Sequence, residues 1–498
     1  ATLITIEVNS SRGCMFYLVG LPDSAVKESH QRIISALQVN GYRMPTSNIV
    51  INMAPADIRK EGAAYDLPLA IGILAASEVI QSDKLERYLL MGELSLDGSL
   101  QPIKGALPIA IKARELGFEG MIVPQQNAHE AAVVNNLKVY GAGNIKEVIE
   151  FFNGTQELTP TLVNTREEFY SQQSNFDFDF AEVKGQENVK RALEVAASGS
   201  HNILLIGSPG SGKSMLAKRL PSILPPLSLG ESLETTKIHS VAGKLGKDGG
   251  LISKRPFRAP HHTISTVAMT GGGSFPQPGE ISLAHNGILY LDELPEYSRN
   301  VLEVLRQPLE DRKITVSRIR CNVEYPASFM LVASMNPCPC GYYNHPTKAC
   351  VCNPGQVQRY LNRISGPLLD RIDIQIEIVP VPFEKISEKQ QAESSASIRE
   401  RVICARKMQE KRFANHPGVY CNAQMESRLL HLYAEPDEQG LNLLRNAMTR
   451  LNLSARAYDR ILKVARTIAD LDHSEQVTSI HLAEAISYRN LDRESWAG

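Results

Sequence analysis

The sequence lacks the features of an exported or membrane-bound protein. No run of 18 or more apolar residues occurs, so we expect no transmembrane helix and no membrane partner. The opening residues, ATLITIEVNS, lack the basic segment and apolar run of a signal peptide, and we expect a cytoplasmic protein. Eight cysteines in a chain of 498 residues do not make a disulfide scaffold.

An excess of charge of either sign is also missing. The 53 Lys and Arg residues nearly cancel the 54 Asp and Glu residues, so the whole chain has no basic signature. Any contact with nucleic acid must therefore come from local patches. Hydrophobic residues (43%) and charged residues (21%) are in the balance of a soluble globular protein. A chain of this length predicts two or three domains.

The pattern of apolar residues changes along the chain and divides it into segments. Residues 1–153 mix strand-like runs (TLITIEV, NIVINMA, MIVP, LKVYGA) with helical patterns (SAVKESHQRIISALQVNG, AAVVNNL). Residues 154–180 lose this periodicity and are predicted to be a linker. In residues 181–383 helices alternate with four nearly continuous apolar runs that predict strands buried on both faces: HNILLIG, GILYLDE, SFMLVASMN and IDIQIEIVP. Residues 384–498 contain only amphipathic helices and predict an all-helical domain.

The strongest motif follows the strand HNILLI and matches G-x-x-x-x-G-K-[ST]. Its glycines let backbone N–H groups converge on phosphate oxygens at the start of the next helix. The lysine can reach the β- and γ-phosphates of ATP, and the final hydroxyl can bind Mg²⁺. An ordinary glycine turn is disfavoured because strand, loop, lysine and helix occur together. The predicted nucleotide-binding residues are Gly207, Ser208, Pro209, Gly210, Ser211, Gly212, Lys213 and Ser214.

Two later strands end in polar residues that suit the same site. ILYLDE ends in Asp292, which would bind Mg²⁺, and Glu293, which would orient and deprotonate the attacking water. LVASMN ends in Asn336, whose amide can bond the γ-phosphate or the water. Alternatively, Asn336 caps the turn before Pro337, and both roles can hold.

These motifs, together with RPFRAPHHTIS, SMNPCPCG and SGPLLDRID, resemble the ComM/YifB family of magnesium-chelatase-like AAA+ ATPases. The resemblance covers essentially the whole chain and places it in the helix-2-insert clade with the MCM helicases. It implies a multidomain α/β protein with an AAA+ P-loop core carrying a helix-2 insert (residues 181–383). It also implies an all-helical C-terminal lid (residues 384–498).

The resemblance assigns two further arginines. Arg371 in LLDRID takes the place of the arginine finger, which reaches the γ-phosphate of a neighbouring subunit, and Arg456 in LSARAYDR takes the sensor-2 place on the lid. Each can neutralise charge on the transferred phosphoryl group. A surface ion pair is the alternative for either one. A finger implies a ring, and the family suggests a homo-hexamer.

The stretch between the first core helix and the acidic strand corresponds to the insert that forms pore loops in this clade. Arg312–Arg320 is predicted to be a basic hairpin, with Lys313, Arg318 and Arg320 as candidates for phosphate-backbone contacts with DNA. Such contacts would be independent of base sequence and sensitive to salt. A solvated basic hairpin explains the pattern equally well.

The first segment resembles the Lon-protease-like α+β domain. An active domain of that type needs a serine nucleophile and a lysine base, whereas EGAAYD has Ala64 at the serine place and PIKGALPI has Leu107 at the lysine place. Without an oxygen nucleophile and an amine base, acyl transfer by this route is impossible. We expect no peptidase activity, and a scaffold or DNA-guiding role for residues 1–153.

Four cysteines, Cys338, Cys340, Cys350 and Cys352, form a C-x-C…C-x-C pattern. Four thiolates suit tetrahedral Zn²⁺, although structural sites usually use wider C-x₂₋₄-C pairs. Reduced cysteines packing a Pro/Gly-rich turn are the alternative, and both stay open. Neighbouring His261 and His262 are expected to point in different directions, which favours a pore-loop or interface role over a metal site.

The sequence leaves three functions to be considered. The first is an ATP-driven translocase or branch-migration helicase on single-stranded or branched DNA, acting in recombination or natural transformation. The second is a protein-remodelling magnesium-chelatase-like motor without DNA activity. The third, an ATP-dependent protease, is opposed by Ala64 and Leu107. The expected cofactors are ATP and Mg²⁺, with Zn²⁺ open.

Overall fold

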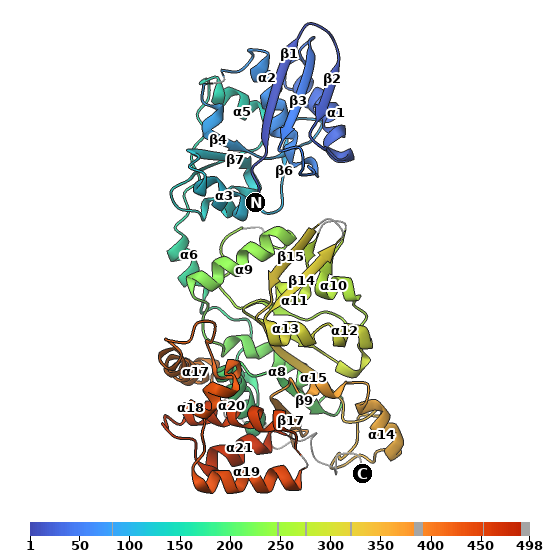
Figure 1. Ribbon diagram of the computed structural model, residues 1–498, viewed down its shortest axis with the longest axis vertical. Helices are drawn as coiled ribbons and strands as arrows, with labels where there is room; N and C mark the ends of the chain where they lie inside the picture. Colours follow the sequence, from blue (N-terminus) through green and yellow to red (C-terminus); the bar gives the residue numbers. More distant parts are fainter. Residues whose placement is uncertain are drawn as a thin grey trace. The chain divides into compact units, whose positions relative to one another are not determined.

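The computed structural model divides the chain into two compact units, shown in Figure 1. The first contains residues 1–172 and 232–252, and the second contains residues 173–231 and 253–498. The structure describes residues 1–81, 83–246, 249–273, 276–318, 321–382, 392–451 and 453–489.

The first unit combines small sheets with short helices. One sheet has the order β1-β3-β2, a parallel sheet has the order β4-β7-β8, and β5 pairs with β6. The strands are β1 (Thr5–Ser11), β2 (Phe16–Val19), β3 (Asn48–Ala54), β4 (Tyr88–Leu90), β5 (Glu93–Leu94), β6 (Leu100–Gln101), β7 (Gly120–Pro124) and β8 (Lys138–Ala142). The helices are α1 (Ser24–Val39), α2 (Asp66–Ala76), α3 (Ala106–Glu115), α4 (Gln125–Ala132), α5 (Ile145–Phe152), α6 (Thr165–Gln172) and most of α9 (Leu229–Ala242).

Residues 232–252 pack with this first unit, although they lie inside the stretch 181–383 that the sequence assigns to the nucleotide-binding core. Leu233 and Leu251 join one of its hydrophobic clusters, and the Ser240 carbonyl accepts a hydrogen bond from Gly105 N–H. Ala64 and Leu107 belong to the same cluster, and Leu107 is fully buried. The two positions that the Lon-type resemblance singles out are therefore part of the same apolar cluster.

The second unit is built on a five-stranded sheet. Its order is β10-β13-β16-β9-β17, and every neighbouring pair is parallel. The strands are β9 (Ile203–Gly207), β10 (Phe257–Arg258), β13 (Ile288–Leu291), β16 (Met330–Met335) and β17 (Ile374–Ile378). The four strands predicted as nearly continuous apolar runs are confirmed as β9, β13, β16 and β17.

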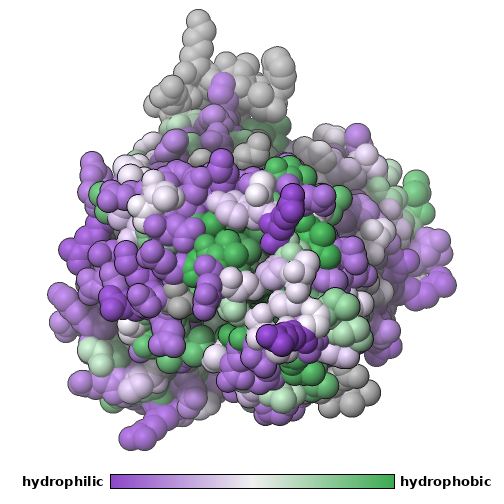
Figure 2. Space-filling view, turned by 90° about the horizontal axis from the view of Figure 1, so that it is seen from above, coloured by the Kyte–Doolittle hydropathy of each residue, from purple (hydrophilic) through white to green (hydrophobic). Residues whose placement is uncertain are grey.

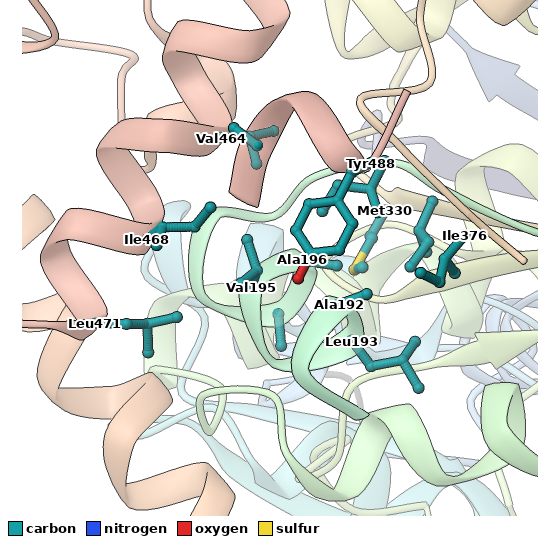
Figure 3. Packing of buried hydrophobic residues seen from close by; sticks show 14 of the residues in the cluster. Ala192, Leu193, Val195, Ala196, Met330, Ile376, Val464, Ile468, Leu471 and Tyr488 are labelled. Carbon is teal, nitrogen blue, oxygen red and sulfur yellow. The ribbon is translucent and has the colours of Figure 1, made fainter. Parts of the chain in front are cut away.

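Both faces of this sheet are covered, which is why its strands are apolar throughout. Along β9, Ile203 and Leu205 enter one hydrophobic cluster, whereas Leu204 and Ile206 enter another on the opposite face. On the first face, α7 (Glu187–Gly199) and the lid helix α20 (Ala455–Leu471) pack together, as Figure 3 shows. Figure 3 also places Met330 and Ile376 of the sheet beside Tyr488 from the C-terminal end.

The remaining helices of the second unit surround the sheet and form the lid. Around the sheet are α8 (Lys213–Arg219), α10 (Thr266–Thr270), α11 (Glu280–Leu283), α12 (Arg299–Glu303), α13 (Arg306–Asp311), α14 (Pro354–Leu361) and α15 (Gly366–Leu369). The C-terminal segment, called the lid, contains α17 (Ser395–Arg412), α18 (Ser427–Tyr433), α19 (Glu438–Arg450), α20 and α21 (Ser479–Ser487); its described part is helical apart from isolated β-bridges. Two short antiparallel pairs complete the unit, β11 (Gly271–Gly272) with β12 (Gln277–Pro278) and β14 (Lys313–Arg318) with β15 (Cys321–Pro326).

Two local expectations differ from the structure. The stretch AAVVNNL was expected to be helical, but α4 ends at Ala132 and the following residues form turns, with Asn136 at a φ of 61°. The helix was not expected there because five of its first six residues, Gln125–Glu130, are polar, with Ala128 as the exception. Residues 154–180, expected to be a linker, contain α6.

Within the described part of the chain, every helix is too short or too polar to cross a membrane. On the face drawn in Figure 2, hydrophilic residues surround smaller apolar patches.

Candidate nucleotide-binding site

The loop Gly207–Ser214 joins the end of β9 to the start of α8. Gly210 and Gly212 have φ values of 79° and 94°, which L side chains rarely adopt. No atom lies within 4 Å of the position that a Cβ would take at Gly210. The Ser211 hydroxyl is buried and has no hydrogen-bond partner among the described residues. A glycine-rich backbone with open space and an unused hydroxyl fits an anion-binding loop.

Lys213 folds back over this loop. Its ammonium group donates to the carbonyl oxygens of Gly207 (2.6 Å) and Ser208 (2.9 Å), and it lies 3.2 Å from Asn336 Oδ1. Burial lowers the pKa of Lys213, while the charge of Asp292 opposes this shift. A buried ammonium held by neutral oxygens is poised to exchange them for phosphate oxygens, which bind it more strongly.

Asp292 gathers the hydroxyl groups of the site. Its carboxylate accepts hydrogen bonds from Ser214 Oγ (2.9 Å) and Ser334 Oγ, and the Tyr290 hydroxyl lies 3.2 and 3.1 Å from these two oxygens. Burial raises the pKa of Asp292, but the hydrogen bonds that its carboxylate accepts outweigh burial, so the pKa lies below its ordinary value. An ionised carboxylate beside a serine hydroxyl is a donor set that suits Mg²⁺, so Ser214 and Asp292 could hold that ion.

Glu293 follows in a left-handed backbone conformation, with a φ of 54°. Its side chain is half exposed, and its backbone N–H donates to Asp292 Oδ1. Its Oε2 atom lies 3.5 Å from Nδ1 of His262. A carboxylate that protrudes beside the loop has the position required of a base that activates water.

A cavity of about 820 Å³ opens next to Glu293 and Asn336. Cys340 and Cys352 line another part of it, together with Arg359 of α14 and Arg363. The candidate base, the candidate amide and two cations therefore face one space, which is large enough to admit an anionic ligand.

The two arginines of the predicted ring interface have contacts elsewhere. Arg371 is 8% exposed; it donates to Pro367 O (2.6 Å) and pairs with Glu310 of the same chain. Its Nε atom has no partner within the described residues. Arg456 is mostly exposed, and its nearest ionic partner is Asp370, at 3.5 Å.

The predicted basic hairpin is present in the backbone, with Lys313 paired to Pro326 and Arg318 to Cys321. Lys313 is half exposed and forms a 2.9 Å ion pair with Glu324, which raises its pKa. The side chain of Arg318 and the whole of Arg320 lie outside the described residues.

The four clustered cysteines converge, with their Sγ atoms all within 4.8 Å of one another. His345, which lies in the intervening loop, accepts hydrogen bonds from the backbone N–H groups of Thr347 and Lys348. Its ring therefore stabilises a turn. The narrow C-x-C spacing does not prevent the sulfurs from meeting.

Three neighbours of the site were not expected from the sequence. Tyr290 and Ser334 hold Asp292, and His262 faces Glu293. The signal for Ser334 was one polar residue inside an apolar run, one position before Met335. The expectation that His261 and His262 point apart is wrong: their rings are 4.1 Å apart, because His261 bonds Thr263 in a tight turn.

Comparison with known proteins gives matches to the same family in three segments of the chain. Models of magnesium chelatase subunit ChlI match residues 6–127, 179–386 and 392–489. The chain is 45% identical over 500 residues to YifB of Escherichia coli, covering 98% of this chain and 94% of that protein. It is 42% identical over 496 residues to the competence protein ComM of Haemophilus influenzae, covering 99% and 96%. A magnesium-chelatase 38 kDa subunit of Rhodobacter capsulatus is 26% identical over 179 residues, covering 32% and 50%.

Proposed function

The chain belongs to the ComM/YifB family of magnesium-chelatase-like proteins, and from this we propose that it is a ring-forming AAA+ ATPase that moves along DNA. The nucleotide site supports the ATPase part of the proposal. Lys213 contacts Asn336, and Ser214 contacts Asp292, across 123 and 78 residues of sequence. These contacts join a phosphate-binding loop to an acid and an amide at the carboxyl ends of parallel strands, where ligands bind in open α/β sheets.

Each residue has a defined task in the proposed hydrolysis. Lys213 leaves its carbonyl partners and binds the β- and γ-phosphates, while Ser214 and Asp292 hold Mg²⁺, which supplies positive charge to the phosphate oxygens. Glu293 accepts a proton from the water that attacks the γ-phosphorus, as the bond to the bridging oxygen breaks. Asn336 orients that water or the γ-phosphate. The proposed cofactors are ATP and Mg²⁺, with Zn²⁺ at the four cysteines.

In the proposed ring, Arg371 and Arg456 supply the remaining positive charges around the phosphates. Arg371 reaches the γ-phosphate of the neighbouring subunit after it leaves Glu310, and Arg456 exchanges Asp370 for phosphate. The buried Nε atom of Arg371, which has no partner among the described residues, supports the idea that its present contacts are incomplete. A homo-hexamer is the assembly that we propose from the family.

DNA is proposed as the substrate of movement, single-stranded or branched. The β14–β15 hairpin carries Lys313 on its exposed part, and the exposed ion pair with Glu324 is weak enough to give way to a phosphate. The name of the Haemophilus influenzae relative, a competence protein, supports a role in natural transformation. The first unit then acts as a scaffold or DNA guide, because an apolar pair, Ala64 and Leu107, stands where a protease would need its nucleophile and base.

The test measures the ATPase rate with single-stranded, duplex and branched DNA while the oligomer size is followed in parallel. We expect stimulation by DNA that falls with salt, and a smaller stimulation in Lys313→Ala. Lys411→Ala, at an exposed position of α17, is the matched control. An ATPase rate indifferent to every DNA, with no gel retardation at low salt, would instead favour a protein-remodelling motor.

A further inference from the structure

The four cysteine sulfurs have the spacing of a metal site. Cys338 Sγ lies 3.3 Å from Cys340 Sγ and 3.7 Å from Cys350 Sγ, and these last two are 3.5 Å apart. Cys352 Sγ lies within 4.8 Å of all three. A tetrahedron of four thiolates around Zn²⁺, with Zn–S bonds of about 2.3 Å, has S···S edges of roughly 3.8 Å. The sulfurs therefore need to move only slightly to hold the ion.

Packing of reduced thiols explains this arrangement less well. Cys338 is fully buried, but the other three are partly exposed, and Cys340 and Cys352 line the cavity, whereas a free cysteine used for packing is normally buried. The backbone N–H of Cys352 donates to the sulfur of Cys350 at 3.4 Å. Donors of this kind around the ligands orient and stabilise metal-bound groups.

The cysteine loop also contacts the nucleotide loop. Gly341 has a φ of 84°, and a Cβ added there would lie 2.5 Å from Cδ of Pro209. The same Cβ would lie 3.9 Å from Cγ of Asn336, which in turn contacts Lys213. The backbone around Gly341 is thus packed directly against the phosphate-binding loop.

The other end of the cysteine loop leads into α14. Directly after Cys352, Asn353 caps this helix, and its partner in the capping box is Gln356. About one turn after Gln356, Tyr360 is buried and lines the same cavity as Asn336. The backbone of Asn336 is close enough to oppose the rise that burial causes in the pKa of Tyr360. The two ends of the loop therefore meet again at the residue that is proposed to sense the γ-phosphate.

The cavity beside the cysteines holds charges of both signs. Four thiolates and one Zn²⁺ carry a net charge of −2, because binding releases all four thiol protons. Arg359 and Arg363 line the same cavity as Cys340 and Cys352, but Glu293 and Glu296 line it too, and Arg363 is paired at 2.8 Å with Glu296. The metal site is therefore inferred from the geometry of the sulfurs and not from an excess of positive charge.

We propose that the four cysteines bind one Zn²⁺ and that this ion braces the catalytic cavity. It does so by fixing the end of β16 to the start of α14, which keeps Gly341 against Pro209 and keeps Asn336 beside Lys213. Zn²⁺ has no redox chemistry, so its contribution is structural. The proposed stabilisation of the cavity rests on the proposed nucleotide site, whereas the proposed metal binding does not.

Metal analysis tests the site. Full-length protein purified without added zinc is expected to carry about one molar equivalent of Zn²⁺, as four ligands from one chain require. Cys350→Ser and Cys352→Ser should lose it, while Cys14→Ser and Cys404→Ser, at exposed cysteines outside the cluster, should keep it. Replacement by Co²⁺ should give the visible absorption bands of a tetrahedral thiolate site. Less than about a tenth of an equivalent in the unaltered chain would overturn the proposal.

Binding of a fluorescent, non-hydrolysable ATP analogue tests the bracing. We expect the cysteine variants to bind it about tenfold more weakly than the control variants, a range seen when groups around a site are lost. Unaltered protein stripped by a chelator should show the same loss after Mg²⁺ is restored, and should recover when Zn²⁺ is returned. This second measurement guards against variants that fail to fold. Metal loss without any change in affinity would overturn the bracing, and an unaltered chain that binds no ATP would overturn the proposed function while the metal result stands.

Discussion

Substitution of Gly341 by alanine measures how closely the cysteine loop and the nucleotide loop are coupled. At a φ of 84° a side chain costs about 1–2 kcal/mol in backbone strain. The new Cβ would also lie 2.5 Å from Cδ and 2.9 Å from Cγ of Pro209, whose ring is rigid. Overpacking of this kind costs about 1–3 kcal/mol. Because neither the new methyl group nor the Pro209 ring has a flexible end that could move aside, we expect the phosphate-binding loop to shift.

The expected result is a loss of both stability and affinity. Each ~1.4 kcal/mol that falls on the ATP-binding conformation weakens binding about tenfold. Thermal unfolding and binding of a fluorescent ATP analogue measure the two effects separately. Gly341→Ala should melt earlier than the unaltered chain and bind the analogue at least about tenfold more weakly.

The matched control is Gly355→Ala in the first turn of α14. There the nearest atom to a new Cβ is Asn353 Oδ1, at an ordinary contact distance of 3.5 Å. Alanine is favoured over glycine in a helix by up to about 1 kcal/mol, so this variant should be as stable as the unaltered chain or slightly more so. If Gly341→Ala matched Gly355→Ala in melting temperature and in ATP affinity, the coupling derived from Pro209 would be wrong.

Three further predictions concern other groups. Lys213→Ala should abolish nucleotide binding, whereas Glu293→Gln should keep ATP bound and lose hydrolysis; a normal rate in the glutamine variant would refute the assignment of the base. In mixed assemblies, Arg371→Ala should depress the ATPase of unaltered subunits and Glu310→Ala should not, and equal effects would indicate that the ion pair is only structural. Burial lowers the pKa of Lys463 to about 8. The unfolded chain therefore binds a proton that the folded chain has lost between about pH 8 and 10.5, so the unfolding free energy should rise with pH there, and Lys463→Met should flatten that rise in denaturant titrations.

The sheet of the second unit could be predicted because its strands are buried on both faces. Four apolar runs then stand out from the helices between them, and all four became strands. The strand β10 did not stand out, since it has only two residues and offers no periodicity. The placement of residues 232–252 with the first unit could not be predicted either. It depends on packing of Leu233 and Leu251 against residues more than 90 positions away, which no local pattern encodes.

The residues of the site also divide into those that could be proposed from the sequence and those that could not. Lys213, Ser214, Asp292, Glu293 and Asn336 could be proposed from the sequence because phosphate chemistry demands those residue types in a glycine-rich loop or at the end of a strand. His262 was missed because its turn stacks two adjacent histidines, and only the folded turn brings one of them to Glu293. The partner of Arg371, Glu310, was missed for a related reason: an ion pair between distant residues follows from packing and has no spacing signature.

The parallel register of the sheet explains why the cysteine loop and the phosphate-binding loop are neighbours. Residues Ile203–Ile206 of β9 pair in order with Val332–Met335 of β16, so both strands end at the same edge. The phosphate-binding loop leaves one strand there, and the cysteine loop leaves the other, with only Asn336 and Pro337 between β16 and Cys338. If the proposed Zn²⁺ fixes Cys338, a displacement of Asn336 by a phosphate is expected to pass to Tyr360, which lines the same cavity. Arg359, on the same helix as Tyr360, would then move with it.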